Sequence, residues 1–398
     1  MVYRYAVIGA GRQGTAAAYD MAKFGDAKSV TLYDLDLKTA EEAARRVNLL
    51  LNREIVSAKK IDVTAEEHLT NELKGVDSFL SAVPYWLNPR ISRCAIAAGA
   101  SMCDLGGKTS LVLEQMKMDR EAADAGISIV PDCGQVPGLG NSLAAYAISL
   151  LDQAEEVHIW DGGIAQNPRP PFNYYLTFNI AGLTNEYYGT ACFLRDGRIT
   201  ELPTFTEDEY ELVDFPEPIG TLEAFVAGGG TSTAPWTYEG KLKTYQNKTL
   251  RYRGHFTQWK TLIDCGLLEE EPIDLGDGVK VSPRHLLHTL LEPRLAPEPG
   301  DKDLVIVRIK SRGQKDGRQA EAFVEVIDYF DQATGFTAME RTTGWHASIV
   351  AIFNARGITP RGVKPVETAV PGHLFVRELR RRGIPLEEKV AYLPITGN

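Results

Sequence analysis

The chain has 398 residues, of which 44% are hydrophobic and 24% are charged, and its formal net charge is −10. This length exceeds what one hydrophobic core usually serves, so we expect two domains. The negative charge disfavours nucleic acid as a partner, because the overall field repels polyanions. No apolar run approaches the ~20 residues of a membrane-spanning helix and no signal segment opens the chain, so we expect a cytoplasmic protein without a membrane partner.

The cysteines do not predict a metal site or a disulfide framework. They are five in number and scattered, without a CxxC pair or a histidine at metal-ligand spacing. We therefore expect free thiols and no bound metal. The densest basic run, 377–382, alternates with apolar positions as a solvated helix surface does, and it predicts no function.

The first third of the chain alternates short apolar runs with helix-length amphipathic segments. The runs that predict strands are 4–8, 29–33, 76–83, 101–105 and 127–131, and the segments that predict helices are 13–24, 38–51, 89–98 and 111–125. This alternation is typical of the α/β class and predicts a doubly wound parallel sheet.

Beyond Pro131 the pattern changes to strand-like runs separated by glycine and proline. These runs are 156–160, 172–178, 304–311 and 322–330, and they predict a mixed or antiparallel sheet. The helical pattern returns in 344–355 and 372–382, and terminal helices often pack back onto the first domain. We therefore expect residues 1–131 and 342–398 to form the first domain, with 132–341 inserted as the second.

A glycine-rich hexapeptide joins the first predicted strand to the first predicted helix. It reads Gly9-Ala10-Gly11-Arg12-Gln13-Gly14, and Asp34 ends the second strand 20 residues beyond Gly14. The G-x-G-x-x-G spacing, the flanking strand and helix, and the distal acid together predict a Rossmann domain that binds a dinucleotide, with the pyrophosphate at the helix N-terminus. The plain alternative is a three-glycine turn before an ordinary helix.

The acid at position 34 also bears on which dinucleotide binds. A carboxylate there would accept hydrogen bonds from the adenosine ribose and would repel a 2′-phosphate, so the sequence favours NAD over NADP. A guanidinium at Arg12 that reaches a phosphate is the open exception. Ala82, Val83 and Pro84 end a strand at the carboxyl edge of the same sheet, where they are expected to admit the nicotinamide ribose, although Pro84 could equally be a turn proline.

Three further segments carry residues suited to chemistry. Asp104 and Lys108 flank a diglycine after a strand, where they are either catalytic groups or a surface pair at a helix start. Asp132 and Gly134 open a glycine- and proline-rich loop that is either a ligand-binding turn or a domain linker.

The third segment contains Arg251, which suits a carboxylate, and His255, whose proton moves near neutral pH. An exposed arginine and a hydrogen-bonded core histidine are the alternative interpretation of this segment.

The ordered set of these motifs resembles the saccharopine dehydrogenase-like oxidoreductases, and within them the lysine 6-dehydrogenases. The resemblance covers nearly the whole chain. The motifs that carry it are GAGRQG with Asp34, the 132–138 loop, Asp161-Gly162-Gly163 with Pro170-Pro171-Phe172, the 248–255 segment, and Arg341-Thr342-Thr343-Gly344. The resemblance implies NAD-linked chemistry at an amino-acid carbon–nitrogen bond, a second domain that binds substrate and dimer partner, and a homodimer or higher homo-oligomer. Arg253 and His346 depart from the family's pattern.

For lysine, the implied reaction is oxidative deamination of the ε-amine to the aldehyde, which cyclises, with release of ammonia. The ε-ammonium must first lose a proton, so a base is required, and His255 and Asp104 are the candidates, with Lys108 a third catalytic group. Arg251 is expected to hold the substrate carboxylate beside Asp132 and Gly134. Phe172 and Tyr174 would furnish an apolar pocket.

Two other functions remain open. A saccharopine-type reaction, or a related reductive condensation that forms a polyamine, would use further cations such as Arg253, Arg169 and Lys108. A non-catalytic NAD-binding protein is the alternative of a different class, because a fold does not fix a function.

Overall fold

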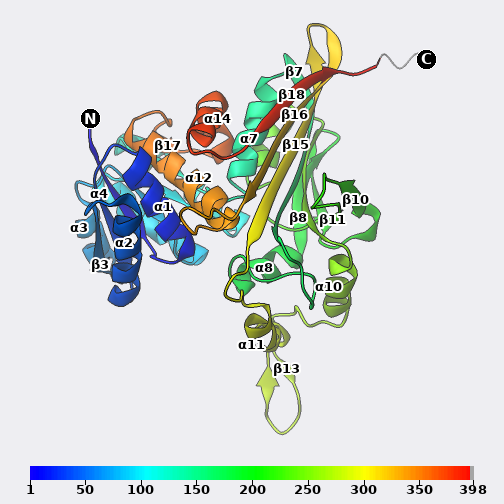
Figure 1. The fold of residues 1–398 in the computed structure, drawn as a ribbon, viewed down its shortest axis with the longest axis horizontal. Helices are drawn as coiled ribbons and strands as arrows, with labels where there is room; N and C mark the ends of the chain where they lie inside the picture. The colour runs from blue at the N-terminus through cyan, green and yellow to red at the C-terminus, as the bar shows by residue number, and fades with distance from the viewer. Residues whose placement is uncertain (395–398) are drawn as a thin grey trace.

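The computed structural model describes residues 1–394 and places two large sheets side by side, each with its own helices (Figure 1). The first is a seven-stranded, fully parallel sheet. In spatial order its strands are β17 (Gly362–Val363), β6 (Ser128–Val130), β5 (Ser101–Asp104), β4 (Ser78–Ser81), β1 (Tyr3–Ile8), β2 (Ala27–Asp34) and β3 (Val56–Lys60). The prediction of a doubly wound parallel sheet is confirmed.

The helices predicted for this domain are present in the predicted order, and the structure adds a helix over 66–73 that was not predicted. They are α1 (Arg12–Phe24), α2 (Leu37–Leu51), α3 (Glu66–Leu73), α4 (Asn88–Ala98), α5 (Thr109–Met116) and α6 (Asp119–Asp124), with the short 3-10 helix η1 (Tyr85–Leu87) before α4. The segment predicted as one helix, 111–125, is two helices. Strand β3 was not predicted, because it is an edge strand with four of its five residues at least partly exposed and lacks the apolar run of a central strand.

The second sheet has nine strands and is mixed, as predicted. Its main path runs β10 (Glu211–Asp214), β11 (Thr221–Phe225), β12 (Thr244–Tyr252), β7 (Gln153–Ala165), β15 (Asp303–Lys315), β16 (Arg318–Tyr329) and β18 (Glu387–Tyr392). Strands β8 (Thr190–Arg195) and β9 (Arg198–Pro203) branch from β12. The accompanying helices are α7 (Leu139–Ser149), α8 (Ile180–Tyr187), α9 (Ala234–Tyr238), α10 (His255–Asp264) and α11 (Pro283–Leu295), with the 3-10 helix η2 (Glu207–Glu209).

One predicted strand is wrong. Residues 172–178 are irregular, and Phe172 and Asn173 have positive φ angles of 65° and 52°, which no strand allows. The aromatic residues that suggested alternation are buried in a cluster beneath the second sheet, where Phe172 and Tyr174 join Trp259. The alternation of aromatic residues in 172–178 therefore came from their burial among other side chains, because this segment pairs with no strand among the described residues.

The C-terminal segment serves both sheets. Helix α12 (Ala338–Ala355) packs on α1, β4 and β5, and β17, α13 (Val366–Ala369) and α14 (Gly372–Arg381) follow it. Strand β18 then pairs with β16, so the chain ends its described part in the second sheet and not in the first domain, to which 342–398 was assigned. Glycine explains the close approach of α12 to α1: a Cβ at Gly344 would lie 2.8 Å from the carbonyl oxygen of Gln13.

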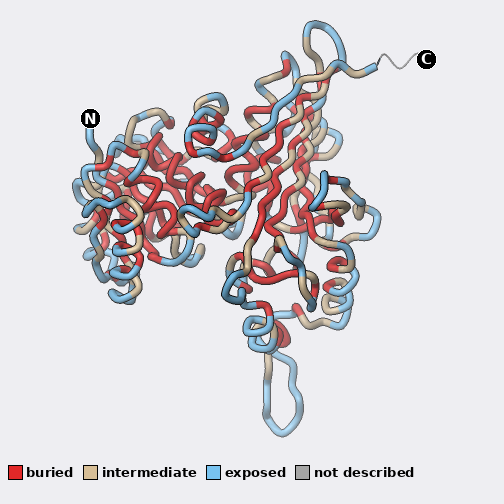
Figure 2. Tube along the Cα trace, viewed as in Figure 1, coloured by how far each residue is buried: buried red, intermediate tan, exposed pale blue. Residues whose placement is uncertain are grey.

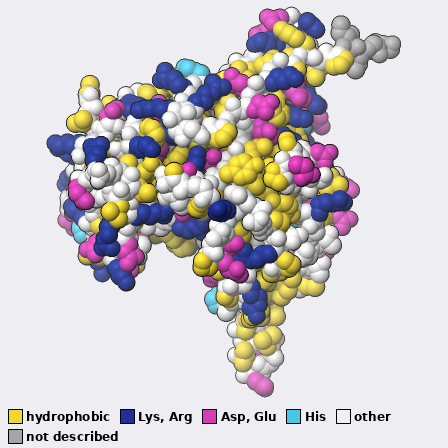
Figure 3. Space-filling model, viewed as in Figure 1, with side chains coloured by type: hydrophobic (Ala, Val, Ile, Leu, Met, Phe, Trp, Pro, Cys, Tyr) yellow, Lys and Arg dark blue, Asp and Glu magenta, His cyan; other side chains and the backbone are white. Residues whose placement is uncertain are grey.

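Buried residues run through both sheets and the helices between them, whereas the hairpin of β13 (Ile273–Asp274) and β14 (Lys280–Val281) projects from the second domain and is exposed (Figure 2). Apolar side chains are visible along this arm (Figure 3), and Ile273, Leu275 and Val279 are about half exposed or more. Within residues 1–394, no helix is both long enough and apolar enough to cross a membrane.

Candidate active site

The three glycines of the loop have the surroundings that dinucleotide binding requires. A Cβ at Gly9 would lie 2.5 Å from the carbonyl oxygen of Ala82, and one at Gly14 would lie 1.9 Å from that of Gly9, so both positions are restricted to glycine by the protein itself. A Cβ at Gly11 would meet no atom within 4 Å. The backbone at Gly11, at the N-terminus of α1, is therefore open to a phosphate, and this arrangement fits a dinucleotide.

Asp34 lies at the end of β2, beside this loop. One carboxylate oxygen accepts a hydrogen bond from the backbone N–H of Ala10 at 2.8 Å, and the other accepts from Asp36 at 3.0 Å. These bonds fix the carboxylate at the rim of the loop, where an adenosine ribose would lie. Arg12 points elsewhere: its Nε lies 3.3 Å from a carboxylate oxygen of Glu340 on α12.

Asp104 is a structural carboxyl in this arrangement. It is fully buried at the end of β5, where its Oδ1 accepts from the backbone N–H groups of Gly106 at 2.8 Å and Asp132 at 3.2 Å. Its Oδ2 accepts from the Gln115 amide at 2.8 Å. Burial raises the pKa of Asp104, and with both oxygens engaged it holds two loops together and is a poor candidate for the base.

Asp132 has the opposite character. It follows β6 with a φ of 58° and is 2% exposed. Its Oδ2 accepts a hydrogen bond from the Ser232 hydroxyl, whereas its Oδ1 is buried without a hydrogen-bond partner in the described part of the chain. Burial, reinforced by the neighbouring Asp104 carboxylate, raises the pKa of Asp132 to about 7. A carboxyl with a free oxygen and this pKa is suited to proton transfer near neutrality.

Ser232 belongs to a glycine-rich turn that sequence reasoning missed. A Cβ at Gly230 in this turn would lie 2.1 Å from Oδ1 of Asn247, so the turn lies directly on β12. Asn247 in turn donates to the Asp161 carboxylate at 2.7 Å. The run of three glycines before Thr231 and Ser232 was the available signal, because it permits such a close backbone approach.

Strand β12 carries a polar face toward this turn. Asn247, Thr249 and Arg251 alternate along it and are buried. Burial raises the pKa of the nearby Asp161 carboxyl on β7 to about 6. Burial also raises the pKa of Glu186 on α8 to about 8, although the Arg251 guanidinium opposes this effect. The buried carboxyl of Asp161 and the partly exposed carboxyl of Glu186 therefore lie near one buried guanidinium.

Arg251 is 3% exposed and is held on two sides. Its Nε donates to the Tyr187 hydroxyl at 2.9 Å, and its Nη1 donates to the hydroxyl of Thr249 at 3.2 Å and to the carbonyl of Leu250 at 2.8 Å. Tyr174 stacks near the guanidinium at 5.2 Å from its ring centre. Within residues 1–394, Nη2 donates no hydrogen bond, so this nitrogen is left to donate to a ligand.

His255 lies near Arg251, because both bond to the Tyr187 hydroxyl, but it does not have the form that a base requires. It is fully buried, its Nε2 lies 2.9 Å from the Tyr187 hydroxyl, and its Nδ1 lies 3.0 Å from the carbonyl oxygen of Phe172. Burial and the Arg251 charge hold the pKa of His255 well below its usual range. With both ring nitrogens occupied, His255 has the geometry of the hydrogen-bonded core histidine that was its alternative interpretation.

The predicted residues Lys108, Pro84 and Gly134 lie on loops close to the contact between the two domains. Lys108 is exposed directly before α5, and Pro84 is exposed after β4. The two domains meet here, because Asn185 on α8 donates to the Tyr85 hydroxyl and to the carbonyl of Gly107, both at 3.3 Å. Gly134 lies in the turn before α7, bridged to Gly138.

His346, which departs from the family pattern, has a structural explanation. It is fully buried in α12, where its Nδ1 lies 2.9 Å from the carbonyl oxygen of Cys133 and its Nε2 lies 3.0 Å from the Ser142 hydroxyl. Burial lowers the pKa of His346 to about 4, so it is neutral at physiological pH. The histidine therefore anchors the chain directly after Asp132.

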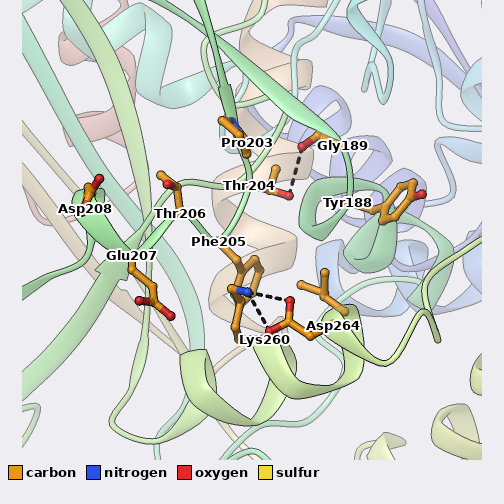
Figure 4. A pocket seen from close by; sticks show the side chains of 11 residues that line it. Tyr188, Gly189, Pro203, Thr204, Phe205, Thr206, Glu207, Asp208, Lys260 and Asp264 are labelled. Carbon is orange, nitrogen blue, oxygen red and sulfur yellow. Dashed lines mark hydrogen bonds and ion pairs between the residues drawn. The ribbon is translucent and has the colours of Figure 1, made fainter.

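A separate surface hollow of about 680 Å³ lies on the second domain (Figure 4). Lys260 and Asp264 form an ion pair in it, with their closest atoms 2.5 Å apart. Phe205 lines the hollow and also packs against Tyr187 at 5.0 Å between ring centres, so the aromatic cluster separates the hollow from Arg251. None of the predicted site residues lines it.

A parallel sheet with this glycine loop, whose carboxyl edge faces the polar side of a second, mixed sheet, defines a two-domain dinucleotide-dependent oxidoreductase. Family comparisons agree. The saccharopine dehydrogenase NADP binding domain matches residues 5–130, and the saccharopine dehydrogenase C-terminal domain matches residues 134–384. The chain therefore belongs to the saccharopine dehydrogenase family, as an NAD(P)-dependent oxidoreductase.

Curated relatives span most of the chain at low identity. Carboxynorspermidine synthase of Vibrio alginolyticus is 23% identical over 376 residues, which cover 88% of each chain. Saccharopine dehydrogenase [NADP(+), L-glutamate-forming] of Pyricularia oryzae is 24% identical over 408 residues, covering 83% of this chain and 88% of that protein.

Solved structures agree on the fold. Apo saccharopine dehydrogenase (L-Glu forming) from Saccharomyces cerevisiae matches with a TM-score of 0.77 at 19% identity, covering 98% of this chain and all of that one. Homospermidine synthase from Legionella pneumophila, solved with NAD, matches with a TM-score of 0.65 at 10% identity, covering 99% of this chain and 92% of that one. At these identities the likeness establishes architecture alone.

Proposed function

We propose that this oxidoreductase acts on an amine of a substrate that carries one carboxylate, and that the reaction is NAD-dependent oxidative deamination of the ε-amine of L-lysine. The observation that carries the proposal is the charge arrangement of the cleft: a buried guanidinium with a free Nη2 lies near the carboxyls of Asp161 and Glu186, and the turn that bonds Asp132 rests on the same strand, β12. One fixed cation suits one carboxylate, and several carboxyls suit an ammonium group.

The other cations argue against a substrate with several carboxylates. Arg169 is bound to Asp301, with its Nη1 2.6 Å from the carboxylate, and Lys248 lies within 3.4 Å of the carboxylates of Glu209 and Glu211. Arg253 is exposed. Saccharopine carries several carboxylates and would need further cations in the buried part of the site, whereas Lys108, like Arg253, is exposed.

Asp132 is the base in this proposal. An ε-ammonium with an ordinary pKa of ~10.4 must lose its proton before the adjacent carbon can be oxidised, which costs about 4–5 kcal/mol near pH 7 in water. The free Oδ1 of Asp132 can accept that proton, while Ser232 holds the other oxygen. Bound NAD would supply the hydride acceptor. Water then attacks the substrate iminium, ammonia leaves, and the aldehyde cyclises.

The cofactor preference is part of the proposal. The fixed Asp34 carboxylate would repel a 2′-phosphate, and Arg12, paired with Glu340, is not directed toward one. We therefore propose NAD, whereas the name of the matched family domain refers to NADP.

A second candidate function is the reductive condensation of an amine with an aldehyde. It is supported by the match to carboxynorspermidine synthase over 88% of each chain. A product of that type, with one carboxylate and several amines, also fits one buried guanidinium among several carboxyls. The two functions share the roles given to Arg251 and Asp132.

Purified protein tests the proposal with lysine and NAD, followed by NADH absorbance and released ammonia. NADH and ammonia formed together, without any keto acid, are the expected result. Turnover that requires a diamine, an aldehyde and reduced cofactor would replace lysine deamination by the condensation. Absence of turnover in both assays would overturn the proposed chemistry and favour a non-catalytic NAD-binding protein.

A further inference from the structure

Tyr187 and His255 form a hydrogen-bonded line that ends on Arg251. The Nε of Arg251 donates to the Tyr187 hydroxyl at 2.9 Å, and the same hydroxyl lies 2.9 Å from Nε2 of His255. The carbonyl oxygen of Phe172, 3.0 Å from Nδ1, can only accept, so the histidine proton lies on Nδ1. Nε2 is therefore the acceptor, and the Tyr187 hydroxyl must donate to it while accepting from Arg251.

Packed side chains enclose both residues of this line. Tyr187 and His255 are fully buried, and the Tyr187 ring makes edge contacts with the rings of Phe205 and Trp259, each 5.0 Å away between centres. His255 is neutral, because burial and the neighbouring guanidinium hold its pKa well below the usual range. A neutral imidazole can accept a hydrogen bond without adding a second positive charge beside Arg251.

We propose that Tyr187 and His255 are positioning residues that orient the Arg251 guanidinium so that its Nη2 faces the substrate carboxylate. Thr249 and Leu250 hold Nη1, and Tyr187 holds Nε, so the planar group is fixed at two of its three nitrogens. The inference rests on the proposed role of Arg251 and adds to it, since neither Tyr187 nor His255 is placed against the substrate.

Tyr187→Phe tests the line, because it removes the hydroxyl and keeps the ring. Tyr188→Phe is the matched control: it is the same change one residue away, where the hydroxyl bonds to Glu269 outside the cluster. For lysine, Tyr187→Phe should raise KM ~10-fold or more with kcat little changed, since a hydrogen bond to a charged group is lost. The control should leave both constants unchanged.

A substrate without a carboxylate separates orientation from general damage. With 1,5-diaminopentane, which has the same amines as lysine but no carboxylate, Tyr187→Phe should match the wild type. His255→Gln, whose amide oxygen can still accept from Tyr187, should raise KM for lysine less than Tyr187→Phe does. Equal losses on lysine and on the diamine, or no change on lysine, would overturn the proposal.

Nitrogen NMR of the histidine rings gives a readout that needs no activity. His255 should carry its proton on Nδ1, and its Nε2 resonance should shift in Tyr187→Phe but not in Tyr188→Phe. An unshifted Nε2 resonance would refute the line itself. If lysine is neither bound nor oxidised while the resonance shifts as expected, the proposed function fails and the hydrogen-bonded line stands.

Discussion

Replacing Asp132 by asparagine should separate catalysis from stability. Asparagine keeps the shape and can still accept the Ser232 hydrogen bond, but it cannot take up a proton. Loss of a positioned general base lowers turnover ~10²–10⁴-fold. Because the pKa of Asp132 is raised to about 7, the wild-type kcat/KM should rise tenfold per pH unit below pH 7 and level off above it. The variant should lack this limb.

As the pH rises, the free energy of unfolding of the wild type should fall while its kcat/KM rises. A carboxyl whose pKa is raised from 3.8 to about 7 in the folded protein stabilises the fold fully below pH 4, and this contribution is lost as the pH rises to 7. Three pKa units at ~1.36 kcal/mol each set an upper bound of ~4 kcal/mol. Asp132→Asn should remove this loss, so its free energy of unfolding should equal or exceed that of the wild type at pH 8.

Denaturant unfolding at pH 4.5 and pH 8, together with initial rates from pH 5.5 to 9, measures both effects. Two results would refute the reasoning: an Asp132→Asn variant that keeps wild-type turnover, or one that loses turnover because it unfolds more easily at pH 8. As a control for the titration, Tyr188→Phe should keep the pH profile of the wild type.

Three further changes test the neighbouring parts of the site. Arg251→Met should raise KM for lysine ~10²-fold and leave NAD affinity intact in a fluorescence titration; an unchanged KM would remove Arg251 from the site. Gly11→Val should abolish dinucleotide binding at an unchanged melting temperature, because a Cβ at this position meets no atom of the protein within 4 Å. Gly14→Ala should lower the melting temperature, because its Cβ would lie 1.9 Å from a carbonyl oxygen. Equal effects of the two substitutions would contradict the roles assigned to the two glycines. Asp34→Ser should raise NADPH affinity ~10-fold or more relative to NADH, and a wild type that already prefers NADPH would contradict the role of Asp34.

Sequence patterns located the first domain well because its central strands are buried on both faces. The β1 and β4 strands are short and mostly buried, and the glycine loop between β1 and α1 has fixed spacing, so local sequence was sufficient. Segment 172–178 shows the limit of this reasoning. Its aromatic residues are buried without a partner strand, and the period of the sequence pattern does not distinguish a buried irregular segment from a paired strand.

Sequence reasoning could single out only part of the candidate site, because residues that meet there lie far apart along the chain. Asp132 and Arg251 stood out through glycine-rich surroundings and residue type. Ser232 lies 100 residues from Asp132, and Tyr187 lies 64 residues from Arg251, so only the folded chain brings these pairs together. His255 shows the converse: its residue type suggested a base, but the occupants of its two ring nitrogens become visible only in three dimensions.

The return of β18 to the second sheet has a mechanical consequence. The chain passes between the sheets after β6, again between β16 and α12, and a third time between α14 and β18. Three separate connections restrict domain rotation more than a single linker does, so we expect Asp132 and Arg251 to keep their spacing without a ligand. A protease that cuts one connection should leave a nicked protein whose halves remain joined and still bind dinucleotide.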